Sequence, residues 1–160
     1  MLRDAAKAAL RRMAKSVTVI TCRHEGQRYA MTATAADALS MDPPSMIVSV
    51  NRAAMLHAPL AAGADFCVNV LARAHEELAR ACGGARRGDE RFGLGDWVEG
   101  PRGVPVLGDA QASFVCQNVV SVGYGTHAVV IGRLIEVRHH VHVDPLVYVD
   151  GRYTTTLPAV

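Results

Sequence analysis

Residues 16–35 read Ser16-Val-Thr-Val-Ile-Thr-Cys-Arg-His-Glu-Gly-Gln-Arg-Tyr-Ala-Met-Thr-Ala-Thr-Ala35, a sequence typical of a β-hairpin. The first half, up to Cys22, is rich in β-branched residues and favours a strand. The second half, from Arg28 onward, returns as a strand with unusually small side chains. The polar tip between them contains Gly26, which suits a tight turn.

The rest of the chain repeats this pattern. We expect about six to eight strands, mostly joined by hairpins, with two or three short helices. Further strands are expected at 45–50, 65–71, 110–122, 128–142, 146–149 and 153–156. Helices are expected within 1–15 and at 53–62 and 74–82. Residues 37–44 are expected to form a break, and residues 83–103 a surface excursion. Because helices of crossover length do not separate the strands throughout, this pattern favours a small closed barrel over a doubly wound parallel sheet.

Length and charge limit the function classes. The 160 residues fit one domain, 1–160, and half of them are apolar. The net charge of +2 makes nucleic acid a poor candidate partner. No apolar run approaches the ~18 residues of a membrane span. The basic, Ala-rich start reads as an amphipathic helix rather than a targeting peptide, which predicts a cytoplasmic protein.

Several motifs that carry chemistry are excluded. Cys22, Cys67, Cys82 and Cys116 form no CxxC pair, which argues against a zinc ribbon and favours buried, reduced thiols. Residues 123–128 match a dinucleotide fingerprint superficially, but a strand-like run follows where a helix is needed. A cluster of histidines at positions 139, 140 and 142 has metal-like spacing, although a solvated strand end is the favoured interpretation.

A row of small residues runs from Thr32 to the proline pair Pro43-Pro44. Such a row leaves the main chain accessible to a flat ligand. Composition alone favours the plainer interpretation, a strand packed under a helix.

The chain as a whole resembles the short-chain flavin reductase family of split-barrel, FMN-binding proteins. The resemblance covers nearly the whole chain and depends on the order and spacing of Val17–Thr21, Met31–Thr34, Leu39–Pro44, Phe66–Leu71, Arg91-Phe92, Gly103–Pro105, Gly125–His127 and Ile131-Gly132. It implies a mainly β split barrel with short helices and a homodimer. It also implies hydride transfer from NADH or NADPH to FMN or FAD, with the reduced flavin commonly serving a separate monooxygenase.

The resemblance implies cofactor-binding residues. The main chain of Thr32, Ala33 and Thr34 would run along the flavin ring, and its donors would stabilise the reduced form. Leu39 and Ser40 match positions near the ribityl–phosphate arm, and Phe92 matches a position near the flavin. Asn51 and Arg52, together with the helix from Ala53, would bind the phosphate. The buried amide of Asn69 needs a partner, which is either the cofactor or a neighbouring backbone group.

His127 matches the histidine near the nicotinamide, where it would orient that ring, and Tyr153 is expected in the same pocket. Hydride transfer needs no general base, so no catalytic residue is assigned. Two departures from the family pattern stand out. Residues 51–57 lack the usual hydroxyls of the phosphate turn, and Thr126 replaces an aspartate before the histidine.

Two other functions remain open. The lost hydroxyls at Ala53 and Ala54 would favour a flavin-binding protein that stores or senses flavin without turnover. A pocket repurposed for haem or a pyridoxal-type phosphate ranks last, because no proximal ligand or lysine can be named for it.

Overall fold

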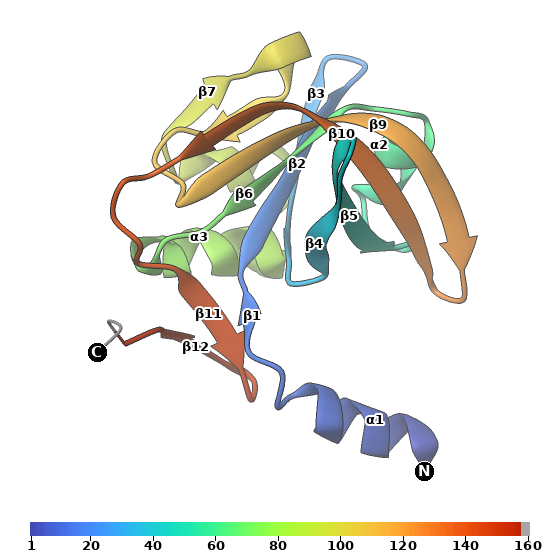
Figure 1. Ribbon diagram of the computed structural model, residues 1–160, viewed down its shortest axis with the longest axis vertical. Helices are drawn as coiled ribbons and strands as arrows, with labels where there is room; N and C mark the ends of the chain where they lie inside the picture. The colour runs from blue at the N-terminus through green and yellow to red at the C-terminus, as the bar shows by residue number, and fades with distance from the viewer. Residues whose placement is uncertain (158–160) are drawn as a thin grey trace.

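The computed structural model describes residues 1–157, and strands dominate it (Figure 1). The strands are β1 (Lys15–Ser16), β2 (Thr18–His24), β3 (Gln27–Ala33), β4 (Ala36–Met41), β5 (Pro44–Asn51), β6 (Phe66–Val70), β7 (Trp97–Glu99), β8 (Pro105–Leu107), β9 (Ala112–Tyr124), β10 (His127–His139), β11 (Leu146–Val149) and β12 (Arg152–Thr155). The helices are α1 (Leu2–Leu10), α2 (His57–Ala61) and α3 (Glu76–Arg80), with short 3₁₀ or π segments η1 (Arg73–His75), η2 (Ala81–Ala85), η3 (Gly88–Gly93) and η4 (Pro101–Gly103).

Most of the strands form one antiparallel sheet that does not close. Its seven strands lie in the order β3-β2-β6-β9-β10-β5-β4, so β3 and β4 are its two edges. β1, β11 and β12 form a small sheet, and β7 pairs with β8. The closed barrel expected from the strand pattern is therefore wrong, and the open sheet agrees with the split barrel that the resemblance implies. The predicted mainly β class with short helices is confirmed.

Turn chemistry explains the hairpins. Glu25 and Gly26 both have positive φ angles, 50° and 78°, and they join β2 to β3. Asp150 and Gly151 do the same for β11 and β12, with φ angles of 49° and 75°. Two consecutive residues with positive φ give a turn whose twist matches that of the flanking strands. Both predicted hairpins are confirmed.

Two predicted elements differ. The break expected at 37–44 contains β4, which pairs with β5 from Ala36↔Val48 to Met41↔Pro44. A strand survives beside the proline pair because the prolines occupy the turn and the first residue of β5, where no ladder donor is needed. The helix expected from Ala53 begins only at His57, because Asn51 holds the preceding residues in a turn.

The core has two main halves, one on each face of β2. Val17 and Val19 pack with α3 in one cluster, whereas Ile20 and Cys22 pack with α2 in the other. Because side chains alternate along a strand, packing on both faces buries the first five residues of β2, including the polar Thr18 and Thr21.

The N-terminal helix is uncovered. α1 has no buried residue and stands away from the sheets in Figure 1. Leu10 and Met13 are both more than half exposed. The predicted first helix is confirmed, but none of its residues is buried by any part of residues 1–157.

Candidate functional site

The edge strand β3 presents bare main chain. Within residues 1–157, β3 pairs with β2 alone, and Arg91 Nη1 donates a hydrogen bond of 2.6 Å to the carbonyl of Ala30 on the open side. Main-chain groups of alternate residues in an antiparallel strand point to the same side. The N–H and C=O of Thr32 therefore face the same open edge, next to the small residues that the sequence analysis identified.

The side chains around Thr32 point to different neighbours. Its hydroxyl donates to the Ala79 carbonyl at 2.6 Å, so the protein itself uses that hydroxyl. Ala33 packs against the core cluster around Ile20. Thr34 lines a cavity of about 390 Å³ beside α1 and the β11–β12 turn. The hydroxyl of Thr32 and the side chain of Ala33 thus serve the protein's own packing, which leaves the main chain as the candidate contact for a flat ligand.

Leu39 and Ser40 lie on β4, the opposite edge of the large sheet. Leu39 is 46% exposed, and the Ser40 hydroxyl accepts a hydrogen bond from the Asp42 N–H at 3.1 Å. Both residues remain accessible to a ligand.

The structure brings the phosphate and nicotinamide candidates together. Asn51 on β5 lies directly opposite His127 on β10. The Arg52 N–H donates to the Thr126 carbonyl at 3.0 Å, and the Thr126 hydroxyl lies 2.8 Å from His127 Nδ1. A Cβ atom at Gly123 would overlap Nη2 of Arg52, so this glycine makes room for the guanidinium. The hydroxyl of Thr126 thus contacts the imidazole where an aspartate is usual.

The turn after β5 differs from the helical phosphate site that the sequence predicts. α2 has only five residues and begins well after Ala53. Asn51 accepts the N–H groups of Ala53 through its side chain and of Ala54 through its carbonyl, at 2.9 and 3.0 Å. Two of the donors expected for a phosphate are therefore used within the turn, and phosphate binding by Asn51 and Arg52 stays a prediction.

Asn69 finds its partners within the protein, which is one of the two alternatives that its buried amide left open, the cofactor being the other. It is 0% exposed, and its Nδ2 donates to the Val19 carbonyl at 2.9 Å. Its Oδ1 accepts from the Leu107 N–H at 2.9 Å and from the Ser113 hydroxyl at 3.2 Å. The protein satisfies this amide completely, and no group remains for a flavin.

Phe92 anchors the core beneath η3. It is buried, meets Trp97 edge-on at 5.0 Å between ring centroids, and carries the Arg28 guanidinium 4.3 Å above its ring. These contacts give Phe92 a structural role, and its contact with a flavin stays a prediction.

Tyr153 lies in the small sheet, whereas His127 begins β10 of the large one. The centroid of the Tyr153 ring lies 5.2 Å from that of Tyr148 and 4.8 Å from the guanidinium carbon of Arg80. The structure does not bring Tyr153 together with His127 in one sheet of this chain.

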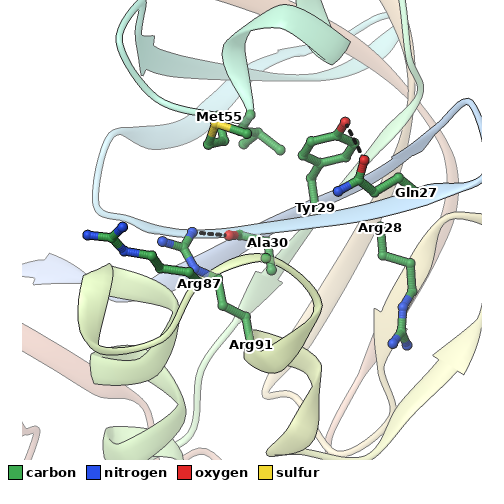
Figure 2. Close-up of a pocket in the computed structure, with 9 residues that line it drawn as sticks. Gln27, Arg28, Tyr29, Ala30, Met55, Arg87 and Arg91 are labelled. Carbon is green, nitrogen blue, oxygen red and sulfur yellow. Dashed lines mark hydrogen bonds between the residues drawn. The ribbon is translucent and has the colours of Figure 1, made fainter.

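A pocket that the sequence analysis missed lies along the open edge of β3. It has a volume of about 340 Å³ and is lined by Gln27, Arg28, Tyr29, Ala30, Met55, Leu56, Arg87, Gly88 and Arg91 (Figure 2). We call it the arginine pocket. The sequence hints at this pocket only through the arginines of the excursion at 83–103. The tertiary fold, which no local pattern predicts, places this excursion beside β3.

The four cysteines are buried and free of disulfides, as expected. Burial raises the pKa of Cys82 to about 11 and those of Cys22 and Cys116 to about 12, so these thiols stay protonated at neutral pH. Within residues 1–157, no three acidic, histidine or cysteine side chains gather as a metal site. In the same range, no helix has the length and apolar character that crossing a membrane requires.

Comparison with known proteins places the chain in a family. Residues 10–157 match the family model described as "Flavin reductase like domain", and the chain belongs to this family. The predicted resemblance is confirmed.

Two relatives cover nearly the whole chain. The reductase component of an FADH(2)-dependent resorcinol hydroxylase from Rhizobium sp. (strain MTP-10005) is 37% identical over 96% of this chain and 87% of its own length. The FMN reductase (NADH) RutF of Pseudomonas syringae pv. syringae (strain B728a) is 34% identical over 91% of this chain and 82% of its own.

Among solved structures, the flavin reductase PheA2 matches with a TM-score of 0.88 and 27% identity, over 98% of this chain and 99% of that one. The reductase component BorF of a bacterial two-component tryptophan halogenase matches with a TM-score of 0.87 and 30% identity, over 96% and 97%. The split-barrel fold is therefore confirmed.

Proposed function

We propose that this protein is an NADH-dependent flavin reductase that transfers a hydride from the nicotinamide to FMN or FAD. The observation that carries the proposal is the bare main-chain edge of β3 at Thr32, in a chain that belongs to the flavin reductase family. NADH rather than NADPH follows the relatives named as NADH-dependent FMN reductases.

The residues at hand fit the chemistry. A flavin held there would supply the hydride acceptor and would carry negative charge on its pyrimidine ring once reduced. Main-chain donors at the β3 edge would stabilise that charge without a titrating side chain. Arg52 supplies a fixed cation, and Leu39 and Ser40 border the flavin from β4. His127 orients the nicotinamide, because its Nδ1 is engaged by Thr126 and Nε2 remains for the ligand.

A homodimer is part of the proposal. The outer half of the β9–β10 hairpin exposes Val120, Val122 and Tyr124 by 41%, 55% and 85%. These residues alternate along β9 and share one face with His127. An exposed apolar strip of this kind is typical of a protein interface. A second copy seated there would lie next to the proposed nicotinamide site, and α1 offers it another uncovered apolar face.

We also propose that the reduced flavin leaves for a separate monooxygenase, since several relatives are named as reductase components of such pairs. A cytoplasmic location is consistent with four free cysteines. Tyr153 remains a candidate for the nicotinamide pocket only if the second copy brings it near His127.

Two measurements test the function. FMN or FAD fluorescence should be quenched by the purified protein, and NADH oxidation, followed by its near-ultraviolet absorbance, should require added flavin. If both flavins stay fully fluorescent at micromolar concentration, the proposal fails. Flavin binding without flavin-dependent oxidation would instead support the second candidate, a storage or sensing protein, which the absence of hydroxyls at Ala53 and Ala54 favours.

A further inference from the structure

The main chain at the tip of the β9–β10 hairpin is fixed on both sides of His127. The two-residue loop Gly125-Thr126 joins the strands, and Gly125 has a positive φ of 55°, which suits the first position of such a loop. The N–H of Arg52 donates to the Thr126 carbonyl at 3.0 Å and ties the loop to the turn after β5. The side chain of His127 therefore starts from a well-defined backbone.

Uncharged neighbours share the face of His127. Asn51 on β5 and Tyr124 on β9 lie directly opposite it in the two ladders, so the three residues form a row across three strands. The guanidinium of Arg52 occupies the space above Gly123, and position 123 points to the other face because side chains alternate along β9. The ring of His127 thus stands in a polar but uncharged row.

The hydroxyl of Thr126 is the polar group that holds the ring of His127. Unlike His24 and His75, His127 has no carboxylate at ion-pair distance within residues 1–157. An ionised carboxylate only accepts and would need a hydrogen on Nδ1, whereas a hydroxyl can donate and let Nδ1 accept. The distance of 2.8 Å between this hydroxyl and Nδ1 suits an O–H donor, because N–H donors more often lie at about 2.9–3.0 Å.

A donating hydroxyl decides what His127 offers to a ligand. In a neutral imidazole one nitrogen accepts and the other donates, so an accepting Nδ1 leaves the hydrogen on Nε2. Thr126 and His127 are both exposed, so a ligand can reach Nε2. An Nε2–H group needs an acceptor, which the carboxamide of a nicotinamide supplies through its oxygen and not through its NH₂ group.

We propose that Thr126 is a positioning residue that holds His127 as the Nε2–H tautomer, and that this Nε2–H donates to the carboxamide oxygen of the nicotinamide. The inference rests on the proposed function for the identity of the ligand, whereas the tautomer is a property of the free protein. A ring that is held at Nδ1 directs its hydrogen bond, and hydride transfer depends on such alignment of the reacting rings.

Nitrogen-15 NMR of the free protein tests the tautomer without turnover. At mildly alkaline pH, the ring signals that disappear in His127→Ala should show a protonated Nε2 and an unprotonated Nδ1 in the wild type. Thr126→Val removes the hydroxyl and should give averaged signals of both tautomers, and Thr126→Ser should restore the wild-type pattern. Thr154→Val, at an exposed threonine of the small sheet, is the matched control and should change nothing. A protonated Nδ1 in the wild type, or wild-type signals in Thr126→Val, overturns the proposal.

Steady-state kinetics test the contact with the ligand. Thr126→Val should raise the KM for NADH about threefold to tenfold at nearly constant kcat, and Thr126→Ser should reverse this effect. The reduced acetylpyridine analogue of NADH keeps the carbonyl oxygen but carries a methyl group in place of the amide nitrogen. Its KM should therefore rise by the same factor in Thr126→Val.

Two kinetic results contradict the proposed contact. An unchanged KM for NADH in Thr126→Val overturns the positioning role. A KM for the analogue that Thr126→Val leaves unchanged places the contact at the amide nitrogen and overturns the donation to oxygen. If the free protein shows the Nε2–H tautomer but oxidises no NADH with either flavin, the proposed function fails and the positioning of His127 by Thr126 stands.

Discussion

Asn69→Ala should destabilise the fold without changing flavin affinity. The substitution removes the acceptor of the buried Leu107 N–H and one partner each of Val19 and Ser113. A buried polar group left unpaired costs about 1–3 kcal/mol, so the free energy of unfolding should fall by about 3–5 kcal/mol. That is a large share of the ~5–15 kcal/mol of a typical domain. For a chain of this size it corresponds to a Tm lower by roughly 10 °C.

Thermal unfolding by circular dichroism and flavin titration of the folded variant are the two measurements. Ser113→Ala provides a graded control, because it removes one side-chain contact and should cost only about 1 kcal/mol. An Asn69→Ala protein as stable as wild type, but with weakened flavin binding, would refute the reasoning and return Asn69 to the cofactor site.

Three further predictions concern the nicotinamide, the dimer and the thiols. His127→Ala should raise the KM for NADH by roughly tenfold with little change in flavin affinity, since one hydrogen bond to the ligand is lost; an unchanged KM in steady-state assays would remove His127 from the site. Val122→Arg should convert a dimer to a monomer in analytical ultracentrifugation, because it places a charge in the exposed strip of β9; a persistent dimer would mean a different interface. Stability should fall above about pH 9, where the unfolded chain ionises thiols that the fold keeps protonated, by about 1.4 kcal/mol per pH unit for each thiol. Denaturant titrations at neutral and alkaline pH measure this slope, and a flat profile would contradict the burial of the thiols.

Local chemistry made the hairpins predictable. Glu25-Gly26 and Asp150-Gly151 need only their own backbone preferences and the strands beside them. The strand β4 was missed because its proline pair reads as a break, and only its place at the sheet edge makes the prolines acceptable.

The site was predictable only where single residues carry it. Arg52 and His127 were identified from the sequence, but their approach depends on the pairing of β5 with β10, which no local pattern encodes. For Asn69, the sequence predicts that a buried amide needs hydrogen-bond partners, but it does not show which residues these are. The fold supplies one of them, the Leu107 N–H. The arginine pocket combines β3, the turn after β5 and the 83–103 excursion, so its members have no sequence pattern in common.

Gly123 ties two distant parts of the chain to one another. A side chain at position 123 would meet the Arg52 guanidinium where it now lies, and this guanidinium, at the end of a long and exposed side chain, would have to move elsewhere. The place of the cation therefore depends on a residue of the hairpin tip. A substitution at position 123 redirects that positive charge and leaves the backbone of the turn after β5 as it is.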